Sequence, residues 1–232
     1  LPIELVIAHG KVLAENGKLT AAIPPYPYPA SVRNTMNVKR PVTAQDFDIA
    51  APPGANTVTA RVIGIIENQA PSRALERTLA VSSGLVDIDR QNDVCQVAVI
   101  ERHHATGKIV NGFVSGFGYT ADCALASSVA HDSHNIIVVG TSKQDMALAA
   151  NLLNEMGGGM VLVSKCEVLA KVEMPIAGLM SDERAEIVAV KADKLVAAMK
   201  ACGCGLNNAV IQHAFLALAV IPELRISDEG II

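Results

Sequence analysis

The sequence predicts a mixed α/β domain, in which helices pack on a mixed sheet. Half of the 232 residues are apolar, whereas aromatic residues make up only 3% and Trp is absent. The core must therefore be built from thin aliphatic layers, which suits helices packed on a sheet. After residue 55, short apolar runs also alternate with two longer segments of helical period.

The first segment predicts short strands followed by a connector. Residues 5–7 and 11–14 are apolar runs separated by the turn residues His9 and Gly10. Residues 24–29 hold four prolines in six positions, which exclude a helix or a central strand. We therefore divide the chain into residues 1–45, strands plus a proline-rich connector, and residues 46–232, the α/β domain.

The middle of the chain is expected to supply the sheet. Residues 57–66 alternate apolar with other side chains and predict a half-buried strand, with a weaker strand at 78–81. Continuous apolar runs predict strands that are covered on both faces. The continuous runs are residues 94–101 and 135–140, and residues 160–164 and 168–172 predict a strand pair.

Two helices are predicted after the central strands. The first is capped by Ser142 and continues to Met156, where three glycines end it. The second is expected to be capped by Ser181 and to end near Gly203. Its residues predicted to face the core are Ile187, Val188, Leu195, Val196 and Met199.

Charge and hydropathy exclude several classes of protein. A net charge of −4 lacks the basic footprint of a nucleic-acid binder. No apolar run is long enough to span a membrane, and the first residues lack the basic segment of a signal peptide, so we expect a cytoplasmic protein. Five scattered cysteines do not predict a disulfide framework. Because the chain begins with Leu, we expect residues ahead of it in the complete protein.

One stretch concentrates the groups that carry chemistry: His131, Asp132, Ser133, His134 and Asn135. It stands just ahead of an apolar run, and strand ends are where α/β folds place their sites. These side chains could ligate a metal, move protons or hydrogen-bond a heterocycle. The His-x-x-His spacing matches neither a strand nor a helix metal motif. A polar turn whose side chains cap the backbone stays open as the alternative.

A second polar cluster follows the apolar run that ends at residue 100. Arg102 could clamp an anion or pair with Asp132, and His103 or His104 could titrate near neutral pH. The alternative is a solvated charged loop. Residues 116–118, Gly-Phe-Gly, could let the backbone approach a ligand, although they lack the full dinucleotide-binding pattern.

Together these segments resemble the C-terminal domain of the adenine deaminase family, in the amidohydrolase superfamily. Residues 6–18 are similar to the strands that follow the barrel of amidohydrolases and complete a small β-sandwich. The likeness covers nearly the whole chain, and residues 131–140 match without a gap. The segments that carry it, in the order of the family, are residues 100–103, 112–118, 127–140, 175–181 and 220–224.

The resemblance implies hydrolysis of adenine to hypoxanthine and ammonia, in purine salvage. It implies two divalent ions, manganese or iron, in a TIM-like barrel, where a metal lowers the pKa of a bound water. None of the six histidines forms the His-x-His of that barrel, so no metal ligand is assigned to this chain. We expect the barrel in a preceding part of the same polypeptide or in a cleaved partner, this chain alone to be inactive, and the enzyme to be a homo-oligomer.

The candidate residues match the C-terminal signature of the family, which does not fix their roles. They could line the mouth of the active site, bind a purine or a metal independently, or cap the barrel and form an oligomer interface. The catalytic candidates are His131, Asp132 and His134, and the substrate-binding or interface candidates are Arg102, His103, Ser133 and Asn135.

Overall fold

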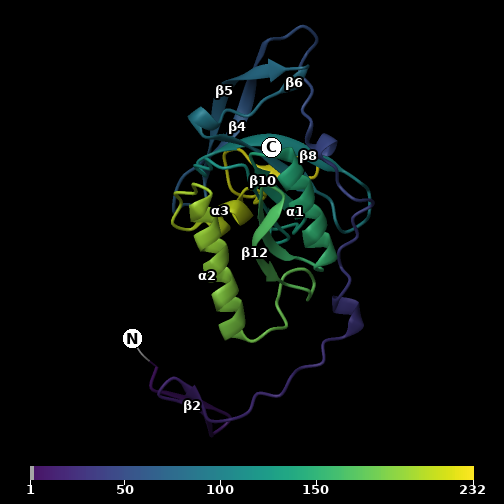
Figure 1. The fold of residues 1–232 in the computed structure, drawn as a ribbon. Coiled ribbons are helices and arrows are strands. Elements are labelled where there is room, and N and C mark those ends of the chain that lie inside the picture. Colours follow the sequence, from purple (N-terminus) through teal and green to yellow (C-terminus); the bar gives the residue numbers. More distant parts are fainter. Residues whose placement is uncertain (1–2) are drawn as a thin grey trace.

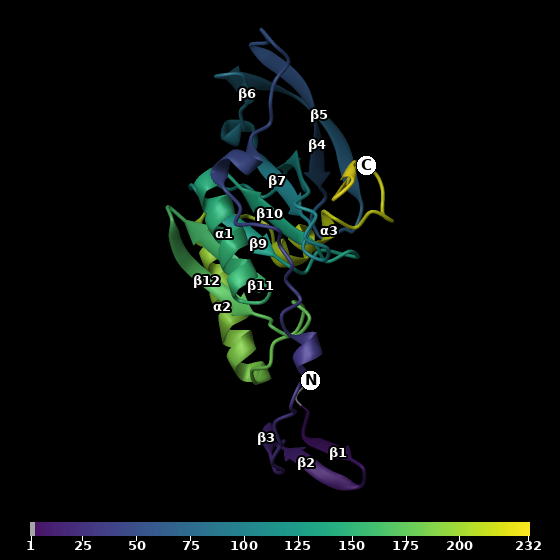
Figure 2. The ribbon, with the colours of Figure 1, turned by 90° about the vertical axis from the view of Figure 1, so that its right-hand side faces the viewer.

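The computed structural model describes residues 3–232; Leu1 and Pro2, the start of the predicted first segment, lie outside the described residues. A small antiparallel sheet lies apart from the main body, at the end of an extended connector (Figures 1 and 2). The strands predicted near the N-terminus are confirmed, and the division of the chain at residue 45 stays a prediction. The small sheet consists of β1 (Leu5–Ala8), β2 (Lys11–Glu15) and β3 (Lys18–Leu19).

The main body is built on one nine-stranded sheet of order β12-β11-β9-β10-β7-β8-β4-β5-β6. The β4–β8 pair is parallel and the other pairs are antiparallel, so the predicted mixed α/β class is confirmed. The strands are β4 (Thr57–Ile65), β5 (Ser72–Ser82), β6 (Leu85–Val86), β7 (Val94–Ile100), β8 (Ile109–Ser115), β9 (Ala124–Ser127), β10 (Ile136–Gly140), β11 (Gly159–Ser164) and β12 (Glu167–Glu173). A hairpin of β13 (Ile226–Ser227) and β14 (Gly230–Ile231) ends the chain.

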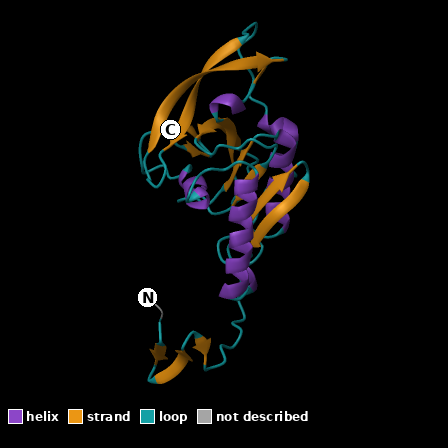
Figure 3. Cartoon of the chain, turned by 60° about the vertical axis from the view of Figure 1, so that its left-hand side comes forward, coloured by secondary structure: helices purple, strands orange, loops and turns teal. Residues whose placement is uncertain are grey.

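Helices cover both faces of this sheet (Figure 3). On one face α1 (Lys143–Glu155) forms a core with β9, β10 and β11. On the other face α2 (Ala185–Ala201) and α3 (Ala209–Phe215) form a second core. Every residue of β7, β9 and β10 is buried. The continuous apolar runs predict this for β7 and β10, whereas β9 was not predicted as a strand from the sequence.

The connector runs onto the main body and joins the core on the α1 side. Its two short 3-10 helices are η1 (Ala30–Val32) and η2 (Ala44–Phe47), and Val42 and Phe47 are buried. The side-chain amide of Asn151 on α1 accepts from Val42 N and donates to Val42 O, each at 2.8 Å. The amide thus pairs with the connector as a neighbouring strand would.

The start of the second helix differs from the prediction. Ser142 caps α1 as predicted, because its Oγ accepts from Asp145 N at 3.3 Å. Ser181, in contrast, accepts from Glu183 N in a turn, and α2 begins only at Ala185. The assignment of Ser181 as the cap was therefore wrong. The intervening turn is held by an ion pair of 2.7 Å between Asp182 and Arg33 of the connector.

The prediction that one residue of α2 faces the core is also wrong. Leu195 and Met199 are buried, and Val188 packs against the same core. Ile187, however, is 46% exposed. Ile187 lies with other exposed apolar residues on the side of α2 that faces away from the sheet. When apolar residues recur on two sides of a helix, their spacing alone does not determine which side is buried.

None of the helices described within residues 3–232 combines the length and the apolar character that a membrane crossing requires. The five cysteines are free thiols, and four of them are buried. Cys202 is the C-cap residue of α2.

Candidate functional site

The register of the central strands brings the two predicted polar clusters together. β10 is antiparallel to β7 with Ile136 opposite Ile100, so the residues before β10 meet the residues after β7. Arg102 N donates to Asn135 Oδ1 at 3.3 Å, and His103 Nε2 lies 2.8 Å from Ser133 O. All seven candidate residues therefore form one group, residues 102–103 and 131–135, which we call the polar cluster.

The Arg102 guanidinium is the buried centre of the polar cluster. Arg102 is 2% exposed, and its pKa is lowered by burial. Its nitrogens donate to the carbonyl oxygens of His134 (2.6 Å), Thr35 (3.1 Å) and Ala177 (3.2 Å). The expected pair with Asp132 is not formed. Since the guanidinium already binds carbonyl groups of three segments, it is not free to clamp an anion.

A tight loop at residues 175–181 closes over this guanidinium. Gly178 has φ +73°, and a Cβ atom there would lie 2.9 Å from Arg102 Nη1, so only glycine fits without displacing the guanidinium. Ala177 N donates to Val32 O of the connector at 2.6 Å, and Ser128 Oγ donates to Gly178 O at 2.5 Å. The loop therefore seals the guanidinium between the connector and the sheet.

Glu101 holds the other side of the same strand end. Its buried carboxylate accepts from His104 N (2.7 Å), Thr106 N (2.9 Å), Thr106 Oγ1 (2.9 Å) and His103 N. Burial raises the pKa of this carboxyl, but the backbone donors outweigh burial and bring the pKa down to about 2. Glu101 thus stays ionised and orders the loop after β7, which excludes it as a proton donor at neutral pH.

The side chains of His134 and Asn135 also have hydrogen-bond partners within the protein; that of Asn135 is Arg102 N. His134 has φ +53°, and its N donates to Ala130 O at 2.7 Å. Its Nδ1 accepts from Ala130 N at 3.3 Å, which assigns the ring proton to Nε2. Burial lowers the pKa of His134, and the neighbouring His131 and Arg102 lower it further. The ring is therefore a neutral acceptor that closes its own loop.

The remaining residues of the polar cluster are turned outward. His103, Asp132 and Ser133 are exposed and His131 is half-buried, with its Nδ1 3.9 Å from Asp132 Oδ1. The loop is anchored to α3, because His131 N donates to Ala214 O at 3.1 Å. These four side chains offer imidazole, carboxylate and hydroxyl groups for hydrogen bonding or proton transfer. Within residues 3–232, no three His, Cys, Asp or Glu side chains are placed to hold a metal ion.

Two sequence features have partners that sequence reasoning did not identify. The acceptors of Arg102 at residues 35 and 177 are backbone carbonyls, which leave no signal in residue type. The glycine loop at residues 116–118 wraps around Asp93, whose carboxylate accepts from Gly116 N and Gly118 N at 2.7 Å each. The close approach predicted for this loop is therefore to a side chain of the protein itself.

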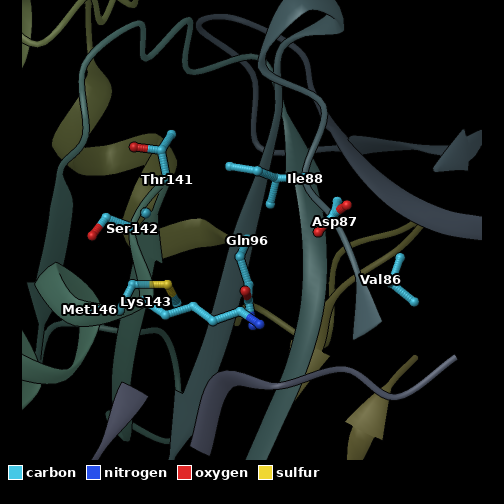
Figure 4. Close-up of a pocket in the computed structure, with 9 residues that line it drawn as sticks. Val86, Asp87, Ile88, Gln96, Thr141, Ser142, Lys143 and Met146 are labelled. Carbon is cyan, nitrogen blue, oxygen red and sulfur yellow. The ribbon is translucent and has the colours of Figure 1, made fainter. Parts of the chain in front are cut away.

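A small cavity lies at the other end of β10, where the chain enters α1 (Figure 4). Its volume is about 100 Å³, well below the roughly 300–1,000 Å³ of common ligand pockets. The Gln96 amide at its wall donates to Phe47 O at 2.5 Å, and Lys143 is paired with Asp48 at 2.6 Å. The polar cluster is therefore a better candidate site than this cavity.

Comparison with known proteins adds an independent line of observation. Residues 69–232 match the family described as the adenine deaminase C-terminal domain. The chain is 63% identical over 232 residues to an adenine deaminase of Mesorhizobium japonicum, and 61% identical over 232 residues to adenine deaminase 3 of Rhizobium meliloti. It is 43% identical over 230 residues to an adenine deaminase of Clostridium botulinum. These matches cover 99–100% of the chain but only 38–39% of each relative.

Replacing Arg102 by Lys should destabilise the fold, since one ammonium group cannot reach three carbonyl groups in three directions. We expect Arg102→Lys to lower the free energy of unfolding by about 2–4 kcal/mol, measured by urea denaturation of the purified chain. Arg73→Ala, at an exposed position of β5, is the control and should change stability by less than about 0.5 kcal/mol. A similarly small loss for Arg102→Lys would contradict the role given to the guanidinium.

The Glu101 carboxylate should make stability depend on pH in the acid range. Its pKa is below the ordinary value of 4.5, so its contribution is complete above that value and is lost as pH falls towards about 2. We expect Glu101→Gln to cost about 1–3 kcal/mol near neutral pH, and the difference from the unsubstituted chain to shrink below about pH 4. Urea denaturation across this range measures it, with the exposed Glu155→Gln as control. A difference that stayed constant with pH would refute the assignment.

Proposed function

This chain belongs to the adenine deaminase C-terminal domain family, and from that premise we propose that its complete polypeptide hydrolyses adenine to hypoxanthine and ammonia. The observation that carries the proposal is the match of the whole chain to relatives named adenine deaminase. Exchange of the C6 amine of adenine for oxygen would place the enzyme in purine salvage. We further propose that the complete enzyme is a cytoplasmic homo-oligomer.

The metal centre of this reaction is proposed to lie outside residues 3–232. A divalent ion supplies hydroxide near neutral pH by lowering the pKa of a bound water. The described side chains do not fit such a centre, because no group of three potential ligands is assembled among them. We therefore assign two manganese or iron ions to a barrel in the preceding part of the polypeptide, or in a cleaved partner, and infer that this chain alone is inactive.

The outer residues of the polar cluster are proposed to line the mouth of that barrel. The connector passes directly beside them: Asn37 N donates to Arg102 O at 2.7 Å, and Asn37 Nδ2 donates to His103 O at 3.1 Å. The polypeptide that precedes the connector therefore enters on the side of the polar cluster. There, the imidazole of His131 and the carboxylate of Asp132 could hydrogen-bond a heterocycle or carry a proton.

The small N-terminal sheet is proposed to complete a β-sandwich with the preceding polypeptide. Its large apolar side chains have no core of their own, and contiguous exposed apolar surface marks an interaction site. The side chains that are exposed on this sheet are Leu5, Val6, Ile7, Val12 and Leu19. This assignment gives residues 1–45 a structural task that is separate from the α/β domain.

A structural role for the inner part of the polar cluster is the second candidate function. Arg102, His134 and Asn135 all have partners within the protein, which favours ordering of the domain surface over contact with adenine. The two roles are compatible, because they belong to different residues. Independent binding of a purine or a metal by this chain is the remaining alternative, and calorimetry with adenine and Mn²⁺ tests it.

Adenine turnover should require the complete polypeptide. We expect the complete polypeptide, loaded with Mn²⁺ or Fe²⁺, to release ammonia from adenine, and this chain with the same metals to release none. Hypoxanthine formation by chromatography is the measurement, and metal-free complete polypeptide is the control. Turnover by this chain alone would refute the placement of the metals, whereas no turnover by the loaded complete polypeptide would refute the proposed activity.

Replacing His131 by Ala in the complete enzyme should separate the two local roles. If the outer residues line the active site, kcat/KM for adenine should fall by roughly tenfold or more, with unchanged oligomeric state and melting temperature. His104→Ala is the matched control, because His104 is exposed and its imidazole has no hydrogen bond within residues 3–232. Unchanged kinetics combined with lost assembly would assign His131 a structural role instead.

A further inference from the structure

Helix α2 is apolar on two opposite sides, and only one of them packs on the sheet. Leu195 and Met199 are buried against the sheet. On the opposite side, Ile187 is 46% and Val190 is 54% exposed, and Ala197 and Ala201 are exposed as well. These four residues lie along one helical row, in which Lys194 stands between Val190 and Ala197, and we call the four the outer stripe of α2. Large apolar side chains that are exposed next to each other on the outward side of a helix indicate a surface that a partner covers.

The outer stripe has the composition of an interface. Three exposed charged residues border it on one side, Glu186, Asp193 and Lys200. Lys194 lies within the row, and a lysine at such a position can lay its methylene chain along apolar surface while its ammonium group reaches the edge. An apolar centre within a charged border is the usual arrangement of protein interfaces. The stripe faces outward because the opposite side of the helix, with Leu195 and Met199, is buried in the core. The stripe is therefore exposed and available for contact with a partner.

The position of α2 indicates which partner covers it. Its N-terminal end is the end directed towards the small sheet β1–β3 (Figures 1 and 2). The connector is tied to the residues that lead into α2, through the Arg33–Asp182 ion pair of 2.7 Å and the bond from Ala177 N to Val32 O. Polypeptide that precedes the connector thus begins on the side to which the outer stripe extends.

We propose that the outer stripe of α2 is a docking surface for the preceding part of the same polypeptide. The chain spans 38% of its relatives, so more than half of their length is available to cover the stripe. This inference rests on the position of the chain within its longer relatives, not on the deamination chemistry. Adenine turnover therefore tests the proposed function separately. The other possible occupant is a second copy of the chain, which would cover the stripe only in an oligomer.

Thiol accessibility in the complete polypeptide tests the proposal. In a Cys166→Ser background, Val190→Cys probes the outer stripe, and Val168→Cys is the matched control. Val168 is 45% exposed on β12, beside Leu152 and Met156 on the α1 side of the sheet. The other four cysteines are buried and should not react in the folded protein. We expect a maleimide reagent to modify the thiol at 190 at least roughly tenfold more slowly than the thiol at 168.

Equal rates of modification at the two positions would overturn the proposal. Protection at position 190 that is lost on dilution to the monomer would assign the stripe to a second copy, and would overturn it as well. Thermal melts and adenine turnover of each variant verify folding, and full modification in denaturant verifies that the thiol is intact. If Val190→Cys fails to fold, Ala197→Cys replaces it, with the same expected protection.

Discussion

The burial of one charged group, the Arg102 guanidinium, determines the arrangement of three segments around it. A buried cation without a carboxylate partner is tolerated only when its donors find acceptors. Here the acceptors are carbonyl groups of the connector, of the loop before β10 and of the loop at residues 175–181. None of these segments could move away without leaving donors of the guanidinium unpaired. The geometry of the polar cluster therefore follows from the requirements of one side chain.

The same end of β7 carries a buried anion next to the buried cation, yet the two are not paired with each other. Glu101 is satisfied by backbone N–H groups and a hydroxyl, whereas Arg102 is satisfied by backbone carbonyl groups. Each ion thus orders a different stretch of chain. The inner residues of the polar cluster already have hydrogen-bond partners within the protein. The side chains that face outward and could make external contacts are therefore those of His103, His131, Asp132 and Ser133.

The exposed apolar surface indicates where the chain could contact a partner. The central strands β7, β9 and β10 of the main sheet are buried on both faces. Exposed apolar residues lie on the small sheet β1–β3, on the outer stripe of α2 and at Val168 and Leu169 of β12. The connector is tied to the turn ahead of α2 by the Arg33–Asp182 ion pair, so the segment that carries the small sheet reaches the main body next to the start of that helix. A chain that forms about 38% of its relatives is expected to show such a side.

The sequence by itself determined the fold class, the buried strands, the first helix and the residues of the polar cluster. These follow from local signals: continuous apolar runs, the cap at Ser142, and five polar residues ahead of a strand. Only the tertiary structure decided that the polar residues after β7 and before β10 form one cluster, because strand register depends on pairing between distant segments. It also decided that Ile187 faces outward and that Arg102 is a buried structural centre. The physical reason is that a backbone carbonyl is present at every residue, so the groups that satisfy a buried guanidinium leave no trace in the amino-acid sequence.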